Sequence, residues 1–211
     1  MDDISDSEGL SGRDIFGGGL YASQVDEGAG EGRLYSVFMI RAVLAATLSS
    51  VYGIYSGFEL CENAAIPGKE EYLNSEKYQF KERDWNAPGN IKDYITKLNK
   101  IRHQNRALRE HENLRFHIVE NEQILFYSKA TEDLDSVILV LVTLDPYNSQ
   151  SGYANVPIEN FGIDASDPYQ VEDLMTGEKF TWHGRRNFVI LDPNTRPAHV
   201  FRVPRRMGRP G

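Results

Sequence analysis

Tyr35-Ser-Val-Phe-Met-Ile-Arg-Ala-Val-Leu-Ala-Ala-Thr-Leu-Ser49 is a largely apolar stretch of this 211-residue chain, and Val51-Tyr-Gly-Ile-Tyr55 follows it almost at once. Apolar residues recur at helical spacing in the first stretch and also occupy its opposite side. This pattern predicts a helix over 35–49 that is buried between other elements. Aromatic and branched residues dominate the second stretch, which predicts a short strand ended by Ser56-Gly57. A helix followed by a buried strand is half of an α/β unit.

A long segment without a period follows the predicted strand. Residues 61–90 contain Pro67-Gly68 and Pro88-Gly89, and about 30 residues without regular structure is long for a compact domain. Such a loop is usually functional or disordered. Its aromatic and charged side chains favour a function, because they stack on the apolar face of a ligand and form hydrogen bonds at its edge. These side chains are Tyr72, Lys77, Tyr78, Phe80, Arg83, Asp84 and Trp85.

A second helix and a series of short strands complete the chain. Residues 91–108 carry an apolar stripe at helical spacing, and Asn90 precedes them as the predicted N-cap. The period then changes to two, in short runs bounded by turn residues, which predicts an antiparallel β-sandwich. The turn Met175–Glu178 is the predicted tip of a hairpin. The predicted strands are 114–119, 123–129, 137–144, 152–158, 169–174, 179–182, 188–191 and 199–203.

The net charge of −8 is concentrated at the N-terminus. Residues 1–32 hold eight acidic residues and one basic residue, while the remaining chain holds 23 acidic and 22 basic residues. Residues 1–33 also contain eight of the 18 glycines, so this acidic, Gly-rich segment is predicted to be disordered. A nearly neutral body gives no electrostatic reason to expect nucleic acid as a partner.

Composition also limits the cofactors and the compartment. The single cysteine, Cys61, excludes an internal disulfide and a cysteine-rich metal site, which favours a reducing cytoplasm. The five histidines are scattered, so neither a metal site nor any other cofactor is expected. No run of about 20 apolar residues occurs, which argues against a membrane span.

The order of these elements resembles the end of α-amylase-type enzymes of glycoside hydrolase family 13. There the last part of a (β/α)8 barrel runs into a C-terminal β-sandwich. Ile54-Tyr-Ser-Gly-Phe-Glu59 is similar to the family's tyrosine-x-glycine-x-glutamate run at the end of the eighth strand. Tyr94–Leu108 resembles its last barrel helix, with Arg106 where proline is common, and Val171–Glu178 resembles a turn of its sandwich.

Three further runs resemble one family within this group, the α-1,4-glucan:maltose-1-phosphate maltosyltransferases. They are Gly53-Ile-Tyr-Ser-Gly-Phe-Glu-Leu-Cys-Glu-Asn63, Glu70-Glu-Tyr-Leu-Asn-Ser-Glu-Lys-Tyr-Gln79 and Arg83-Asp84-Trp85. The resemblance covers roughly 35–204 and implies the C-terminal end of the barrel over 34–108 and a C-terminal β-sandwich over 109–204. Composition adds the disordered segment over 1–33 and a basic tail over 205–211.

The resemblance also implies a reaction, the transfer of maltosyl units from α-maltose 1-phosphate to the non-reducing end of an α-1,4-glucan, with retention. Retention needs a carboxylate nucleophile and a carboxylic acid about 5 Å apart. In the family these groups lie on earlier barrel strands, so no catalytic residue has a counterpart here. We therefore expect a fragment that is inactive alone. The resemblance also implies that the full-length protein is a homodimer and that it works in glycogen-type glucan synthesis. The expected compartment is the cytoplasm.

The substrate contacts that the resemblance implies are Lys77 and Tyr78, which in the family touch the maltosyl unit of the donor. An ammonium group donates up to three hydrogen bonds to hydroxyls, and a phenol both stacks and donates. For Glu59 a structural hydrogen-bonding role is expected, rather than a catalytic pair with Glu62. Arg83 and Asp84 are expected to pin the loop through a charge-assisted pair.

Two alternatives remain open. The sandwich could be a non-catalytic carbohydrate-binding or structural module that binds glucan through Tyr147, Tyr153 and Trp182. Another polypeptide could also supply the missing barrel strands. A strand without barrel neighbours exposes an open edge, so residues 35–108 are expected to stay molten or aggregate while 109–204 folds.

Overall fold

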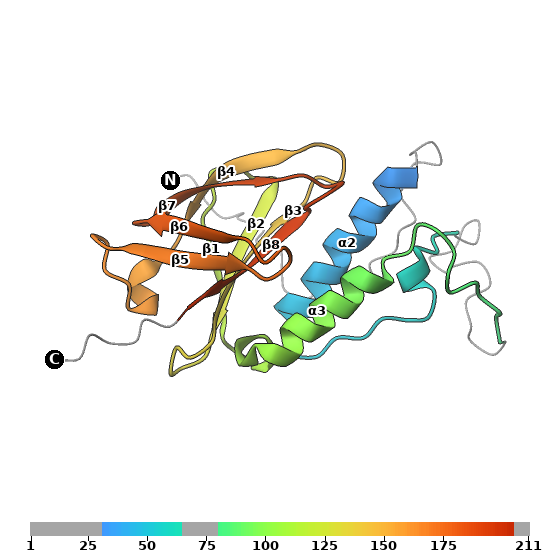
Figure 1. The fold of residues 1–211 in the computed structure, drawn as a ribbon, viewed down its shortest axis with the longest axis horizontal. Helices are drawn as coiled ribbons and strands as arrows, with labels where there is room; N and C mark the ends of the chain where they lie inside the picture. The colour runs from blue at the N-terminus through green and yellow to red at the C-terminus, as the bar shows by residue number, and fades with distance from the viewer. Residues whose placement is uncertain (1–30, 65–79, 205–211) are drawn as a thin grey trace, which may run out of the picture. The chain divides into compact units, whose positions relative to one another are not determined.

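The computed structural model describes residues 31–64 and 80–204, which Figure 1 shows as a helical part beside a β-sheet part. The predicted disorder over 1–33 lies outside the described residues, except that helix α2, Glu31–Leu48, already begins before residue 33. The basic tail 205–211 lies outside them as well. The helices and strands described below belong to one compact unit, formed by Gly28–Glu62 and Arg83–Gly211.

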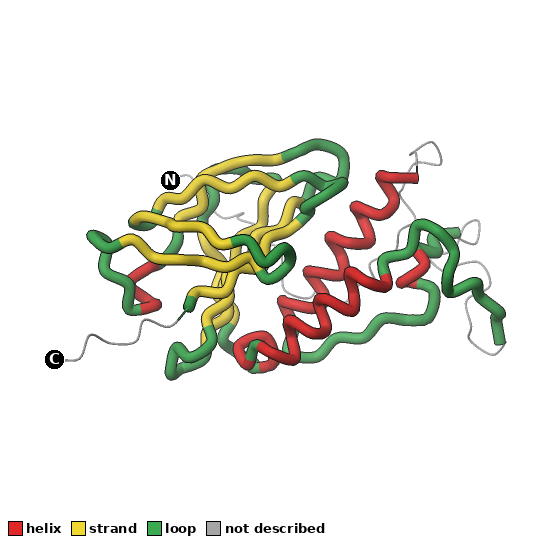
Figure 2. Tube along the Cα trace, viewed as in Figure 1, coloured by secondary structure: helices red, strands yellow, loops and turns green. Residues whose placement is uncertain are grey.

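Eight strands form an antiparallel β-sandwich, as predicted (Figure 2). One sheet has the strand order β1-β2-β3-β8-β5-β6, and β4 pairs with β7 in a second sheet. β1 and β2, and β2 and β3, are consecutive antiparallel pairs, and β5 and β6 form the predicted hairpin around Met175–Glu178. The strands are β1 Leu114–His117, β2 Ile124–Ala130, β3 Val137–Thr143, β4 Gln150–Asn155, β5 Pro168–Asp173, β6 Lys179–His183, β7 Arg186–Leu191 and β8 Ala198–Val203.

The central strand β3 is buried on both faces, which explains why its sequence is continuously apolar rather than alternating. Its residues Val137, Leu139 and Leu141 enter the core between the two sheets, together with Trp182 and Phe201. The alternate residues of β3 point to the other face of the six-stranded sheet, which α2 covers. The sheet is therefore the middle one of three layers.

Helix α2 is buried along much of its length, as the sequence predicts for a helix that is apolar nearly all round. Phe38 is 1% exposed, and Val43 is fully buried. The Thr47 hydroxyl donates to the Val43 carbonyl (2.7 Å), so the Tyr127 hydroxyl of β2 donates to Thr47 Oγ1 (2.6 Å). This bond joins the helix to the sheet inside the core, and burial raises the pKa of the Tyr127 phenol.

Helix α3, Lys92–Gln104, is shorter than the predicted helix over 91–108. The predicted N-cap Asn90 lies one residue too early: Ile91 holds the N-cap position without a side-chain cap bond, and Asn90 Oδ1 accepts from the Lys92 N–H (3.2 Å). The helix ends early because Asn105 is extended and its side-chain amide donates to the Ile101 carbonyl (2.7 Å). The 3₁₀ helix η2, Arg106–Arg109, continues the chain with the next residues.

The predicted strand over 51–55 is wrong. These residues form no ladder within the described ranges, and Val51, Ile54 and Tyr55 are 75%, 40% and 46% exposed. A strand exists only beside a second strand that accepts and donates its backbone hydrogen bonds, and no described strand lies next to this segment. Of the predicted helix–strand–helix end of a barrel, the described residues therefore contain the two helices but not the strand.

Arg102 of α3 holds the end of α2 against this irregular segment. Its guanidinium donates to the carbonyls of Ala46, Ser49 (2.8 Å) and Ser50 (2.7 Å), and to Leu108 of η2 (3.2 Å). Carbonyls at a helix C-terminus lack intrahelical donors and carry partial negative charge, so a cation is the matching partner. One side chain thus joins three backbone segments. The division of the chain into a barrel end over 34–108 and a sandwich over 109–204 stays a prediction.

Candidate functional site

The base of the long loop is built by the residues on either side of 63–82. After the irregular segment, the 3₁₀ helix η1, Phe58–Leu60, lies between two residues with left-handed backbone, Gly57 (φ 105°) and Cys61 (φ 56°). The Gly57 carbonyl accepts from the Glu62 N–H (3.0 Å), and the Glu59 carbonyl accepts from the Ile91 N–H (2.8 Å). The second bond ties the two ends of the loop together across 32 positions of sequence.

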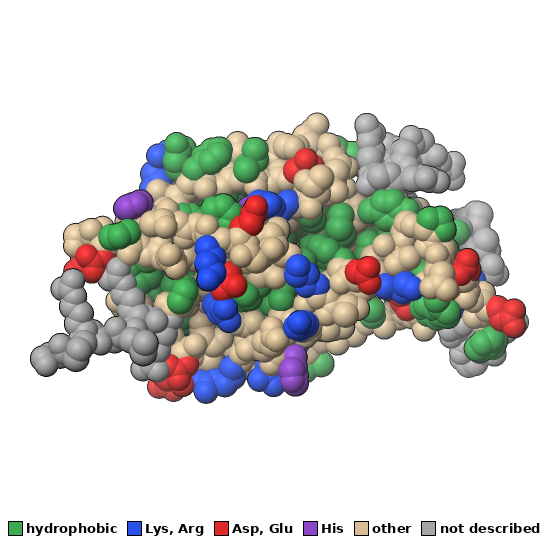
Figure 3. Space-filling view, viewed as in Figure 1, with side chains coloured by type: hydrophobic (Ala, Val, Ile, Leu, Met, Phe, Trp, Pro, Cys, Tyr) green, Lys and Arg blue, Asp and Glu red, His purple; other side chains and the backbone are tan. Residues whose placement is uncertain are grey.

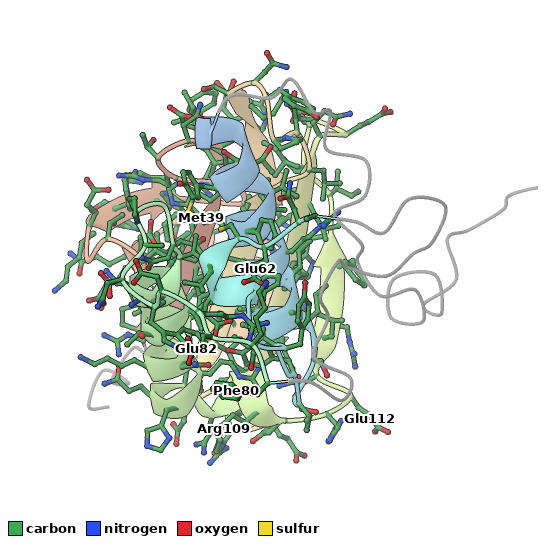
Figure 4. All side chains as sticks on the ribbon, turned by 90° about the vertical axis from the view of Figure 1, so that its right-hand side faces the viewer. Met39, Glu62, Phe80, Glu82, Arg109 and Glu112 are labelled. Carbon is green, nitrogen blue, oxygen red and sulfur yellow. The ribbon has the colours of Figure 1, made fainter. Side chains whose placement is uncertain are left out.

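An ion pair connects the residue before the loop, Glu62, to the residue after it, Arg83. Arg83 Nε donates to Glu62 Oε1 (3.1 Å) and its second nitrogen to Glu62 Oε2 (3.4 Å), and the Arg83 side chain is only 4% exposed. We name the Glu62–Arg83 pair the loop clamp. Figure 4 looks onto this end of the molecule, where Glu62 lies in front of α2. A fork-shaped pair with a buried guanidinium and a half-buried carboxylate fixes both position and angle, so the clamp sets where residues 62 and 83 lie at the base of the loop.

The clamp corrects one detail of the sequence analysis. Arg83 does pin the loop, but its partner is Glu62 rather than Asp84. The Asp84 carboxylate instead accepts from the Asn86 N–H (2.9 Å), which forms a local turn. The sequence could not reveal this pair, because the two residues are 21 positions apart and no periodic element connects them.

The predicted substrate contacts Lys77 and Tyr78 lie outside the described residues, as does Tyr72. Trp85 follows the clamp and is 44% exposed, and its carbonyl accepts from the Lys92 ammonium at the start of α3. The indole ring is therefore open to solvent next to a fixed piece of backbone, on the side of the loop that returns to α3.

The carboxylates at the loop base have structural partners. The Glu59 side chain accepts from the Gly57 N–H (3.1 Å), and the Glu62 side chain accepts from Arg83. Both side chains are therefore engaged in hydrogen bonds at the loop base, which agrees with the structural role expected for Glu59. Cys61 is 4% exposed, and burial raises the pKa of its thiol to about 12, so it is no nucleophile at neutral pH.

Of the three aromatic residues considered for a carbohydrate-binding sandwich, the structure exposes two and buries one. Trp182 is 7% exposed and packs in the core against Phe201 and Tyr169, which removes it as a surface contact. Tyr147 and Tyr153 are 47% and 37% exposed. Alternation along a strand decided this outcome, because Trp182 occupies the inward position of β6.

A buried polar pair of the sandwich was not found from the sequence. His199 Nδ1 lies 2.8 Å from Asp173 Oδ2, and its Nε2 lies 3.2 Å from the Ile190 carbonyl oxygen of the other sheet. Both side chains are buried, and the imidazole stacks on Phe201. The pair joins the two sheets, and its position inside the core gives it no access to a ligand.

The described ranges contain neither a cluster of metal-binding side chains nor a membrane-spanning helix. Within 31–64 and 80–204, no three His, Cys, Asp or Glu side chains come together as a ligand set for a metal ion. Neither helix of the described chain is long and apolar enough to cross a membrane.

Two helices packed on an antiparallel sandwich, with a clamped loop ahead of the second helix, define the C-terminal region of an α-amylase-type fold. An α-amylase from Geobacillus thermoleovorans, solved with acarbose, superposes with a TM-score of 0.57 over 82% of this chain and 34% of its own, at 15% identity. The maltogenic α-amylase AmyB from Thermotoga neapolitana gives a TM-score of 0.54 over 80% and 36%, also at 15% identity. At such identity the likeness concerns the fold alone.

The sequence comparisons point to one group of proteins. Residues 116–203 match the family model described as GLGE, C-terminal. The chain is 55% identical over 166 residues to the α-1,4-glucan:maltose-1-phosphate maltosyltransferase of Rhodospirillum rubrum, covering 79% of this chain and 24% of that protein. The enzyme of the same name from Pseudomonas aeruginosa is 46% identical over 168 residues. The predicted resemblance to the C-terminal part of these maltosyltransferases is confirmed, and the chain spans about a quarter of their length.

Proposed function

We propose that this chain serves as the C-terminal part of a maltosyltransferase that extends α-1,4-glucans from α-maltose 1-phosphate, with retention of configuration. The observation that carries the proposal is the 55% identity over 166 residues to the Rhodospirillum rubrum enzyme of that name. The match extends well beyond the residues of the C-terminal domain model, 116–203, and so includes helical and loop residues. Its place in glycogen-type synthesis, a homodimer and a cytoplasmic location belong to the same proposal.

In this proposal the loop between Glu62 and Arg83 carries the donor contacts Lys77 and Tyr78. The clamp supports the assignment, because it fixes the two residues between which this loop runs. Lys77 would donate to sugar hydroxyls, and Tyr78 would stack on the maltosyl unit or donate to it.

The chain by itself carries out no transfer in this proposal. Retaining transfer needs a free carboxylate nucleophile and a nearby carboxylic acid. The two carboxylates next to the loop, Glu59 and Glu62, are engaged with Gly57 and Arg83. In this proposal the chain binds and positions the donor, while the acid–base chemistry comes from barrel strands that precede these residues in the family.

A chimera tests the proposal. The matched 166 residues of the Rhodospirillum rubrum protein are replaced by the corresponding residues of this chain, and phosphate release from α-maltose 1-phosphate is measured with maltohexaose as acceptor. We expect the chimera to retain activity within about tenfold of the parent, since tenfold corresponds to about 1.4 kcal/mol of transition-state stabilisation. An inactive but folded chimera would contradict the proposal.

Two substitutions in the chimera test the donor contacts. Lys77→Ala and Tyr78→Phe are expected to lower kcat/KM by about tenfold or more, because each removes a hydrogen bond to the substrate. Lys69→Ala, which removes a lysine from the same loop, is the matched control and should have little effect. If Lys69→Ala and Lys77→Ala reduce activity equally, Lys77 has no specific role.

A further inference from the structure

An apolar groove opens at one end of the sandwich. It has a volume of about 450 Å³ and is bounded by the β2–β3 turn, by the 3₁₀ helix η3, Ile158–Phe161, and by the ends of β5 and β8. The sandwich core reaches the surface here, because four of the apolar lining residues belong to the buried core cluster and two pack against it. These six residues are Val137, Ile163, Tyr169, Val203, Leu134 and Phe161. We name this feature the end groove.

Leu134 lines the end groove in a backbone conformation that leucine rarely adopts. Its φ is 56°, in the left-handed region, where the side chain crowds the backbone. The turn is held by the Leu134 N–H, which donates to the Thr131 carbonyl (2.9 Å), and by the Thr131 hydroxyl, which donates to Asp133 Oδ1 (2.6 Å). Glycine or asparagine would fit this backbone with less strain, so the apolar side chain is the property that an occupant of the groove would use.

The two loops beside the end groove are acidic. Residues 131–136 and 158–168 together hold six acidic residues and no lysine or arginine. Arginines from other segments pair with two of the six, Asp133 and Glu159, so the loops keep a negative balance. Figure 3 shows acidic side chains at the left-hand end of the molecule, where these loops lie in Figure 1. The rim of the groove therefore attracts positive charge.

The lining of the end groove is unsuited to a small polar ligand. Such ligands are held by a few convergent polar groups within an apolar pocket. Among the described residues that line the groove, the charged and amide side chains are Asp133 and Gln170, and Asp133 is engaged by Thr131 and Arg106. An apolar floor with a carboxylate rim instead matches a chain segment that carries one apolar side chain among cations.

A segment of this kind follows directly in the sequence. Pro204 lines the end groove and is followed by Arg205-Arg-Met-Gly-Arg-Pro-Gly211, which has three arginines, one methionine and no acidic residue. Seven extended residues span at most about 25 Å, and residues of both acidic loops line the same groove as Pro204, so the segment can contact both. A methionine side chain fills irregular apolar gaps, and arginine pairs with carboxylates through parallel hydrogen bonds.

We propose that the end groove binds residues 205–211 of the same chain, with Met207 between Leu134 and Phe161 and the three arginines on the carboxylates of the rim. This contact does not depend on the proposed function, because it involves only the sandwich and the segment that follows it. In the bound state the segment covers the part of the core that reaches the surface. Salt controls its occupancy, because the Debye length falls from about 8 Å at 0.15 M salt to about 3 Å at 1 M.

Nuclear magnetic resonance of the whole chain, with ¹³C-labelled methionine methyl groups, tests this contact. The chain has four methionines, and Met207→Leu identifies the resonance of Met207. We expect that resonance to lie upfield of its position in the free peptide 205–211, because the rings of Phe161 and Tyr169 line the end groove. Raising the salt concentration from about 0.15 M to about 1 M should reduce this difference at least twofold.

Two variants alter the end groove, and a matched variant leaves it unchanged. Gly162→Asn adds a side chain to the lining at φ 65°, where the space around a Cβ is open, and asparagine tolerates this backbone. We expect it to reduce the upfield shift at least fivefold. Leu134→Asn removes one apolar wall and should reduce the shift at least twofold. Gly177→Asn makes the same change at φ 83° in the β5–β6 hairpin, again with open space, and should keep the shift. Circular dichroism shows that each variant remains folded.

Competition by added peptide measures the contact without altering the chain. A tethered segment has an effective concentration in the millimolar range, so the free peptide 205–211 should move the Met207 resonance halfway to its free position at about millimolar concentration. A peptide with Arg205→Gln, Arg206→Gln and Arg209→Gln should need at least tenfold more. A peptide with Met207→Ser should also need at least tenfold more.

Three results would overturn the proposal: a Met207 resonance at its free position in the unchanged chain, an undiminished upfield shift in both Gly162→Asn and Leu134→Asn, or equal competition by the peptide without arginines. An upfield shift that disappears on dilution would assign the end groove to the segment of a second copy and would also overturn it. Neither an active nor an inactive chimera changes these outcomes, so the contact and the proposed function fail separately.

Discussion

Arg102 allows a sharp test of how the helices are held on the sandwich. Its guanidinium is the shared donor for the carbonyls at the end of α2 and for Leu108 of η2. It also lies 4.9 Å from the centroid of the Tyr52 ring. Burial lowers the pKa of Arg102, so the fold tolerates a desolvated cation in return for these contacts. The variant Arg102→Met keeps the apolar stem and removes every polar contact.

The expected loss follows from which carbonyls can find water instead. Ser49 and Ser50 are half-buried, so their carbonyls can be hydrated after the substitution, whereas Ala46 and Leu108 are buried. Each buried carbonyl left without a donor costs about 1–3 kcal/mol. The lost interaction with the helix dipole adds about 0.3–1 kcal/mol, and the relieved desolvation of the guanidinium offsets part of the total. We expect Arg102→Met to lower the free energy of unfolding by about 3 kcal/mol.

Urea denaturation with two probes measures this loss. Far-ultraviolet circular dichroism follows the helices, and fluorescence in a Trp85→Phe background follows Trp182, the other of the two tryptophans, inside the sandwich. Arg102→Lys keeps the charge but not the fork, and should lose about half as much. Arg109→Met, an exposed arginine of η2, is the control and should lie within about 0.5 kcal/mol of the unchanged chain.

The result that would refute the reasoning is a stability of Arg102→Met within about 0.5 kcal/mol of the unchanged chain. If the helical signal unfolds earlier while the Trp182 signal keeps its midpoint, the helices and the sandwich are separate cooperative units. That outcome would support the expectation of a molten segment over 35–108. Coincident transitions that shift together would contradict that expectation and show one cooperative unit.

Burial lowers the pKa of Lys129, which is 1% exposed, to about 8, so its charged form is disfavoured in the folded chain. That cost is complete below pH 8 and disappears as the pH rises toward about 10.5. Lys129→Met should therefore be about 1–2 kcal/mol more stable at pH 7, with the advantage vanishing by pH 10.5 in urea titrations. A stability advantage of Lys129→Met that stays constant between pH 7 and 10.5 would contradict this prediction. Gly57→Ala places a Cβ at φ 105°, 2.4 Å from a carboxylate oxygen of the loop clamp, and should cost about 2–4 kcal/mol by thermal denaturation. Gly184→Ala, with φ 56° and open space around its Cβ, isolates the backbone part and should cost about 1 kcal/mol; equal losses would show that the clamp adjusts freely. His199→Leu leaves the Asp173 carboxylate buried without its imidazole, and should cost about 3–5 kcal/mol. In urea titrations, adding Asp173→Asn should recover part of that loss, and strict additivity of the two changes would refute the pairing.

The failures of the sequence analysis have a common cause. The residues 51–55 have the composition of a strand, yet composition cannot supply the neighbouring strand that a ladder requires. Trp182 looked available for a ligand, although its register on β6 turns it into the core. In both cases the deciding interaction lies with residues remote in the sequence.

The sequence by itself determined the elements whose signal is local. Short alternating or continuously apolar runs between turn residues located the eight described strands, the helical stripe located α3 apart from its last turn, and nearly continuous apolar character predicted a buried α2. Alternation and helical spacing arise from backbone geometry within one segment, so a single sequence is sufficient to read them.

Only the tertiary structure decided the rest. The loop clamp joins positions 62 and 83, and Arg102 meets carbonyls more than 50 residues away. Such contacts depend on how separate elements pack against each other, and the spacing of residues within one element does not determine that packing. For that reason the base of the loop could be defined only after the chain was folded.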